Sequence, residues 1–138
     1  MNNFLVPRNI MWAGIVLIAL IGLIHLVEAP EYFEVATYVG LLFLANAAGS
    51  ALSAYGIYRG AGWGWALGAL LAVGAFVAYI VSRAVGLPGA PGLAQEEFFE
   101  PLGILSLLAE GLFVVLYATR ASRRTQEAPR TARNRTIA

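Results

Sequence analysis

The stretch IMWAGIVLIALIGLIHLV, residues 10–27, decides the fold class, because it contains no Asp, Glu, Lys or Arg. A helix rises about 1.5 Å per residue, so roughly 20 apolar residues cross the hydrocarbon core of a bilayer. Three more predominantly apolar stretches follow, at residues 36–58, 63–85 and 101–119, with Arg83 and Glu110 as their only charged residues. The sequence therefore predicts an all-α, polytopic membrane protein: a four-transmembrane-helix bundle.

The composition agrees with this fold class. Of the 138 residues, 59% are hydrophobic and 12% are charged, whereas a soluble domain has about 25% charged residues. The formal net charge is +1 and the aromatic residues lie where membrane interfaces place them, so we expect no nucleic-acid partner. The chain has no cysteine, which excludes disulfides, thiolate metal sites and cysteine nucleophiles.

The charged residues orient the four predicted spans. One side receives almost all of the basic residues: Arg8, Arg59, Arg120, Arg123, Arg124, Arg130, Arg133 and Arg135. The other side receives Arg83 with six acids: Glu28, Glu31, Glu34, Glu96, Glu97 and Glu100. Basic residues flanking spans stay in the cytoplasm. We therefore expect a multi-pass protein of the cell membrane with both termini cytoplasmic.

The chain divides into a transmembrane domain, residues 1–120, and a basic cytoplasmic tail, residues 121–138. We expect the tail to be disordered unless a partner or anionic lipid orders it. Pro30 is expected in the first turn of the second span, where its missing N–H costs nothing, and Glu31 and Glu34 would then share that turn.

Small residues predict how the helices pack. Gly60, Gly64, Gly68 and Ala72 recur every four residues, a spacing that lets helix backbones approach closely in membranes. A second stripe of small or weakly polar residues runs along one face of the second span. These stripes are expected to face one another or a partner protein.

Glu110 is the most informative polar residue. It lies in the middle of the fourth span, at nearly the depth that Asn46 has in the second. A carboxyl at this depth is costly and indicates function by default, and Asn46 is its expected partner. Glu110 either binds a proton or cation, or serves as a neutral hydrogen-bonding group that holds helices together.

His25, the only histidine, lies near the outer end of the first span. His25 and Glu28 share a helix face and Glu31 follows, a ligand set chemically suitable for a divalent metal. The alternative is a hydrogen-bonded interfacial histidine beside ordinary loop charges, since the spacing matches no standard zinc signature. Glu34, Glu96, Glu97 and Glu100 extend an outer acidic cluster that either attracts cations or is simply solvated. Arg83 is expected to pair with one of these glutamates or to reach the lipid headgroups.

Two segments resemble uncharacterised small four-span membrane proteins of GC-rich, actinobacterial-type genomes. The first is HLVEAPEY, residues 25–32, and the second is SRAVGLPG, residues 82–89, followed by EPLG, residues 100–103. The resemblance extends from the first span to the fourth. The resemblance implies that the same outer-loop residues recur together in those proteins. It does not imply any activity.

Two functions are consistent with these observations. The first, which the sequence favours, is an accessory or assembly subunit of a larger membrane complex, such as one that handles electrons or metals, with other membrane subunits or copies of itself as partners. The second is a stand-alone carrier or sensor for a proton or divalent metal that uses His25, Glu28, Glu31 and Glu110. An enzyme is less favoured, because no acid–base pair or nucleotide motif is recognisable.

Overall fold

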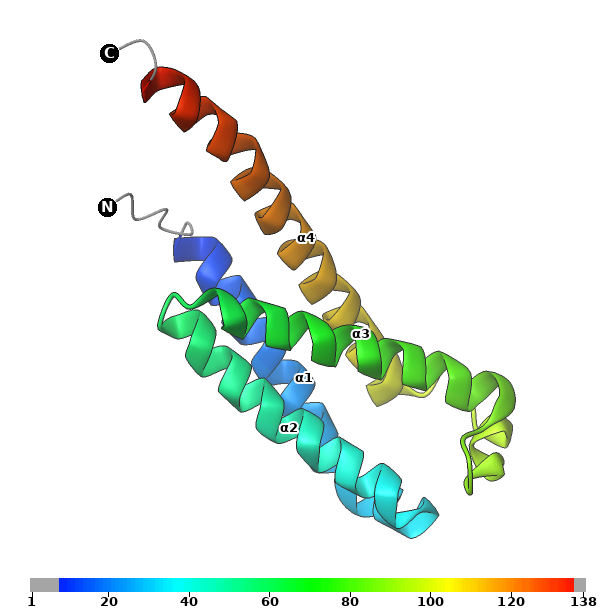
Figure 1. Cartoon of the computed structure of the whole chain (residues 1–138). Coiled ribbons are helices and arrows are strands. Elements are labelled where there is room, and N and C mark those ends of the chain that lie inside the picture. Colours follow the sequence, from blue (N-terminus) through cyan, green and yellow to red (C-terminus); the bar gives the residue numbers. More distant parts are fainter. Residues whose placement is uncertain (1–7, 136–138) are drawn as a thin grey trace.

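The computed structural model describes Arg8 to Arg135, with side chains described through Arg123 and at Thr125. Figure 1 shows a bundle of helices that diverge towards one end. The elements in chain order are α1 (Arg8–Val35), α2 (Thr37–Tyr58), α3 (Gly62–Val85), the short 3₁₀ helix η1 (Pro91–Gln95) and α4 (Pro101–Arg135). Each of the four α-helices contains a segment long and apolar enough to cross a membrane, in α4 Pro101–Arg123. The predicted all-helical architecture is confirmed.

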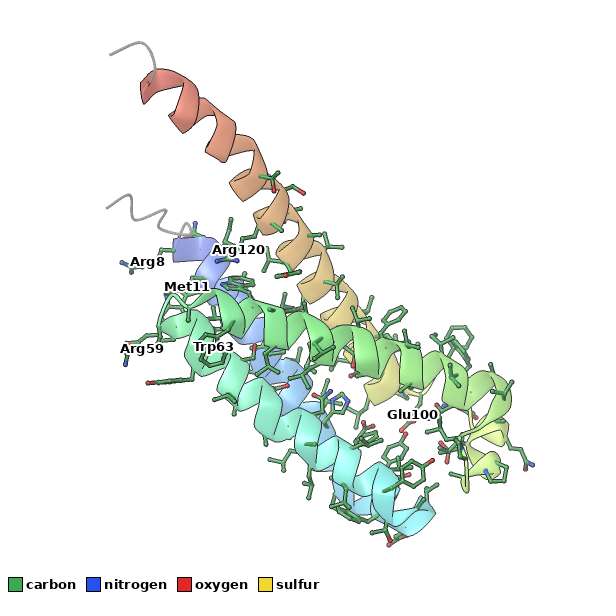
Figure 2. The ribbon with its side chains drawn as sticks, in the orientation of Figure 1. Arg8, Met11, Arg59, Trp63, Glu100 and Arg120 are labelled. Carbon is green, nitrogen blue, oxygen red and sulfur yellow. The ribbon has the colours of Figure 1, made fainter. Side chains whose placement is uncertain are left out.

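The two ends of the bundle differ in charge. Figure 2 shows Arg8, Arg59 and Arg120 gathered at one end, here called the basic end, and Glu100 at the other. The second, acidic end includes the α1–α2 junction and residues 86–100, and it carries these acids: Glu31, Glu34, Glu96, Glu97 and Glu100. The charge segregation expected from the sequence is thus preserved in the folded chain.

The helices pack most closely in the half of the bundle nearer the basic end. The buried side chains there are Ile18, Ile21, Ile57, Trp65, Ala69, Ala72, Ala109 and Phe113. A Cβ added to Gly64 would lie 2.5 Å from the backbone nitrogen of Ile57, and one added to Gly68 would lie 2.5 Å from the Phe113 ring. The small residues of α3 therefore face α2 and α4 of the same chain, as small-xxx-small spacing allows.

Helices α2 and α3 meet at a tight turn and then separate. Gly60 in this turn has φ +71°, a left-handed conformation that glycine adopts without steric cost. Ser53 Oγ donates a hydrogen bond of 2.7 Å to the Gly64 carbonyl, which fixes the two helices beside the turn. Figure 1 shows them diverging from there towards the acidic end.

The expected position of Pro30 is wrong. Helix α1 continues through Pro30 to Val35, and only Ala36 separates it from α2. Pro30 cannot donate the hydrogen bond of a helix interior, but Ala29 before it and Tyr32 after it are both buried, so packing supports the helix on both sides of the proline. Glu31 and Glu34 consequently lie in the last turns of α1, not in the first turn of α2.

The basic tail also differs from the prediction. Instead of becoming disordered after residue 120, the backbone of α4 remains helical to Arg135. Extending an existing helix needs no new nucleus, and the Ala, Arg, Gln and Glu residues of this segment are good helix formers.

The segment between α3 and α4 folds back at the acidic end. Leu87 and Ala90 form an isolated bridge, and Gly86 and Gly89 have positive φ angles. Tyr38 Oη donates a hydrogen bond of 2.6 Å to the Pro88 carbonyl, which ties this segment to α2.

Arg83 attaches the same segment to α3. Its Nη1 lies 3.0 Å from Oε2 of Glu96, and its Nη2 lies 3.2 Å from Oε2 of Glu100. Nη2 also donates to the hydroxyl of Tyr32, at 3.3 Å. The expected pairing of Arg83 with an outer glutamate is confirmed, and two glutamates take part.

Candidate functional site

A cavity of about 440 Å³ lies between the helices in the half of the bundle nearer the acidic end. Its volume is within the range of small-molecule sites, roughly 300–1,000 Å³. Most of the wall is apolar, and all four α-helices contribute to it. The polar side chains on the wall are His25, Glu28, Tyr32, Asn46, Tyr79, Ser82, Ser106 and Glu110.

Helix α1 contributes His25, Glu28 and Tyr32, which lie on one face because positions three and four apart are neighbours on a helix. His25 Nδ1 lies 2.9 Å from the Ile21 carbonyl oxygen. Because a carbonyl only accepts hydrogen bonds, Nδ1 must carry the proton, and Nε2 of the neutral ring keeps the lone pair. His25 is thus held in one orientation with one nitrogen able to accept a proton.

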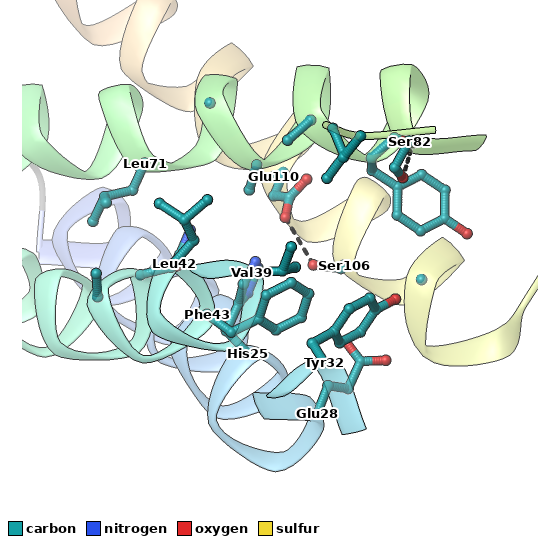
Figure 3. Close-up of a pocket in the computed structure, with 18 of the residues that line it drawn as sticks. His25, Glu28, Tyr32, Val39, Leu42, Phe43, Leu71, Ser82, Ser106 and Glu110 are labelled. Carbon is teal, nitrogen blue, oxygen red and sulfur yellow. Dashed lines mark hydrogen bonds between the residues drawn. The ribbon is translucent and has the colours of Figure 1, made fainter. Parts of the chain in front are cut away.

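Glu110 reaches the cavity from α4 (Figure 3). The residue is only 2% exposed. Ser106 Oγ donates a hydrogen bond of 2.8 Å to its Oε1, and no donor in the described part of the chain reaches its Oε2. A buried carboxyl oxygen without a partner is unusual, because burial removes water without replacing it.

The expected hydrogen bond between Asn46 and Glu110 is not present. Both residues line the cavity, but Asn46 Oδ1 accepts a hydrogen bond of 3.2 Å from Ser50, one turn along its own helix. Glu110 likewise uses Ser106, one turn back on α4. Each of these hydrogen bonds stays within one helix, so no hydrogen bond between Asn46 and Glu110 joins α2 to α4.

Glu28 links the cavity with the acidic end. It is buried on the cavity wall and lies within electrostatic range of Glu110 on one side and of Arg83 and Glu100 on the other. Since Arg83 is already paired with Glu96 and Glu100, the two cavity carboxyls are not neutralised by a dedicated basic residue among those described.

The proposed metal ligands are not brought together as a set. His25 and Glu28 face the cavity, whereas Glu31 is exposed. Within residues 8–135, no group of three or more His, Cys, Asp or Glu side chains is arranged to hold a metal ion. His25, Glu28 and Glu110 have in common that they line the cavity.

The remaining predicted residues lie away from the cavity. Glu34 and Glu97 are exposed at the acidic end. Arg120 is buried at the basic end, with its guanidinium carbon 4.9 Å from the centre of the Trp65 ring. Arg123 is exposed, and the side chain of Arg124 lies outside the described residues.

Sequence reasoning missed the aromatic part of the site. Tyr32 and Phe43 are stacked, with ring centres 4.1 Å apart, and Phe43 also lies 4.9 Å from the His25 ring. The signal was the spacing of His25, Glu28 and Tyr32 on one helix face, and it was hidden because the first span was expected to end before Tyr32.

Comparison with protein-family models, with curated proteins and with solved structures gave no match. The site is therefore interpreted from its own geometry.

Proposed function

We propose that this protein is an integral protein of the cell membrane, with both termini in the cytoplasm, and that it acts as a proton-binding carrier or sensor. The observation that carries the proposal is the unpartnered Oε2 of Glu110, buried in a cavity that also contains His25 and Glu28. The acidic end would then face outwards and the basic end the cytoplasm.

The outward faces of the helices support insertion into a bilayer. Large apolar side chains are exposed along every span, among them Val16, Leu23, Leu41, Leu52, Leu70, Val77, Leu108 and Leu112. Soluble monomers rarely expose contiguous apolar patches of more than a few hundred Å². A lipid environment satisfies such surfaces, and the four helices satisfy their own backbone groups as lipid requires.

The position of Glu110 supports proton binding. An ionised carboxylate in an apolar interior is unfavourable unless a cation or several donors compensate for it. Ser106 is the one donor that reaches Glu110 among the described residues. A proton or another cation is therefore the chemical complement of this site, and exchange of that cation would change the charge of the cavity.

The other function predicted from the sequence, an accessory subunit of a larger complex, stays a prediction. That prediction was based partly on stripes of small residues that could contact a partner protein. Gly56 and Gly64 are instead in contact with each other, and the side chains of Phe113 and Ser53 occupy the space beside Gly68.

Infrared difference spectroscopy tests the proposal directly. The protein is reconstituted in lipid nanodiscs and spectra are compared across pH, with the carbonyl band of a protonated carboxyl as the readout. We expect a band that titrates and that loses amplitude in Glu110→Gln. The amide of this variant keeps an acceptor for Ser106, so the fold should persist, which size-exclusion chromatography and circular dichroism verify.

Glu97→Gln is the matched control, because Glu97 is an exposed carboxyl at the acidic end. This variant should retain the titrating band. If Glu110→Gln leaves the pH-difference spectrum unchanged, Glu110 does not exchange a proton and the proposed function fails.

A further inference from the structure

We propose that the cavity binds a lipophilic cation, an apolar molecule carrying an ammonium- or phosphonium-type charge, which enters sideways from the bilayer between α2 and α3. This inference rests on the proposed function for the position of the cavity within the membrane. It adds the chemical class of the ligand and the route by which the ligand arrives.

The cavity opens on the lateral surface of the bundle. Its wall includes Leu42 of α2 and Leu70 of α3, which are 58% and 71% exposed. Gly74 of α3 also lines the cavity, is exposed, and has no heavy atom within 4 Å of the place where a Cβ would stand. Leu42 belongs to α2 and Leu70 and Gly74 to α3, the two helices that Figure 1 shows diverging towards the acidic end. In a bilayer this opening faces hydrocarbon, so an apolar molecule reaches it without crossing water.

The charges on the wall select a cation. Glu28 and Glu110 both line the cavity, while among the described residues that line it none is Arg or Lys. Oε2 of Glu110 has no partner in the described structure. A cation in this apolar space would satisfy that oxygen, whereas an anion would add a like charge where the low dielectric strengthens repulsion.

Aromatic rings add a second element of cation recognition. Tyr32, Phe43 and Tyr79 line the cavity, and Figure 3 shows Tyr32 and Phe43 on the same side as Glu28. Ring faces attract ammonium-type cations, more strongly when the site excludes water. Carboxylates beside aromatic rings in an otherwise apolar cavity suit a cation that carries its own apolar groups better than a small hydrated metal ion.

Protons should compete with this ligand. The titratable groups that line the cavity with Glu110 are His25, Glu28 and Tyr32 from α1 and Tyr79 from α3, while α2 contributes the non-titratable Asn46. Arg83 and Glu100 at the acidic end lie within electrostatic range of Glu28. Protonation of Glu110 removes the charge that attracts the cation. Binding should therefore weaken as the pH falls.

Two hydrophobic ions of the same shape and opposite charge provide the test. Equilibrium binding of tetraphenylphosphonium and tetraphenylborate is measured on the protein in nanodiscs, with empty nanodiscs subtracted. We expect saturable binding of the phosphonium only, weaker at acidic pH. Removing one member of a buried charge pair weakens binding strongly, so Glu110→Gln should reduce the affinity roughly 30-fold or more.

A pair of tryptophan variants tests the entrance. Gly74→Trp places a large side chain in the opening, whereas Gly111→Trp places the same side chain on α4 at a glycine that also has open space but does not line the cavity. We expect Gly74→Trp to abolish phosphonium binding and Gly111→Trp to retain it. An equal loss of phosphonium binding in both variants would contradict entry of the ligand between α2 and α3.

The remaining outcomes separate this inference from the proposed function. Equal binding of both ions, or an unchanged affinity in Glu110→Gln, would overturn the cation site. Absence of phosphonium binding would overturn it as well. In each case, a Glu110 infrared band that still titrates would leave the proposed proton-binding function intact. Conversely, selective phosphonium binding without a titrating Glu110 band would contradict the proton-binding function and support the cation site.

Discussion

Gly64 and Gly74 belong to the same helix but have opposite surroundings. A Cβ at Gly64 would lie 2.5 Å from the Ile57 nitrogen and 2.8 Å from the Gly56 Cα, both of which are backbone atoms that cannot move aside cheaply. A Cβ at Gly74 would meet open space. The same residue type therefore permits close helix contact at one end of α3 and leaves room for a cavity further along.

Alanine at these two positions should have opposite effects on stability. Gly64→Ala should lower the free energy of unfolding by about 1–3 kcal/mol, because overpacking forces the backbones apart. Gly74→Ala should be neutral or stabilising by up to about 1 kcal/mol, since alanine is the better helix former. Thermal unfolding in detergent, followed by circular dichroism, measures both. Equal melting temperatures for the two variants would contradict the close contact at Gly64.

The polar side chains of the spans show what was readable at the level of single residues. The sequence indicated that Asn46 and Glu110 lie at similar depth, and both do line the cavity. Their mutual hydrogen bond was not readable, because each has a serine one turn away on its own helix: Ser50 for Asn46 and Ser106 for Glu110. Local partners are reached at lower entropic cost than partners on another helix.

Helix α1 extends beyond the span that the sequence predicted. Hydropathy ended the first span near Val27 because Glu28, Pro30 and Glu31 follow, yet α1 extends to Val35. The pattern was misleading because Glu28 faces the cavity and Tyr32 the interior, so the polar residues there do not mark a loop. Helices α2 and α3 begin and end within one residue of the predicted spans, because the turn at Gly60 and the glycine-containing segment after Val85 separate them from their neighbours. Helix α4 begins at the predicted Pro101 but continues past residue 119.

Pro30→Ala should stabilise α1. Alanine restores a backbone donor inside the helix, where proline costs up to about 3 kcal/mol, and removes a ring that crowds the preceding turn. We expect a higher melting temperature in detergent. Pro101→Ala is the control: Pro101 is the first residue of α4, a position where the missing N–H costs nothing, so its melting temperature should barely change. A lower melting temperature for Pro30→Ala would show that the proline supports the acidic end.

For the whole molecule, the absence of native cysteine makes the membrane orientation directly testable. Arg59→Cys places a thiol in the turn at the basic end, and Glu97→Cys places one on the exposed segment at the acidic end. A membrane-impermeant maleimide should label Glu97→Cys on intact cells and Arg59→Cys only after permeabilisation. The reverse pattern would invert the proposed orientation and direct the acidic end into the cytoplasm.

The cavity is the feature that the sequence could not reveal. Hydropathy predicts the number of spans, and flanking charges predict an orientation, because each depends on residues close together in the chain. The cavity depends on the angle between α2 and α3, which is set by the turn at Gly60 and by contacts that Ser53 and Gly64 make across the helices. Such an angle is a property of packing between distant segments.

The contributions of the helices to the cavity also follow an order in time. His25 and Glu28 come from α1 and Asn46 from α2, while Glu110 comes from α4. A ribosome makes these helices from the N-terminus onwards, so the first three spans emerge before the last carboxyl exists. In a bilayer, a chain interrupted before α4 would expose six of the eight polar wall residues to lipid, and it would lack Ser106 and Glu110, which complete the site. The cavity is therefore complete only once the chain has been synthesised as far as Glu110.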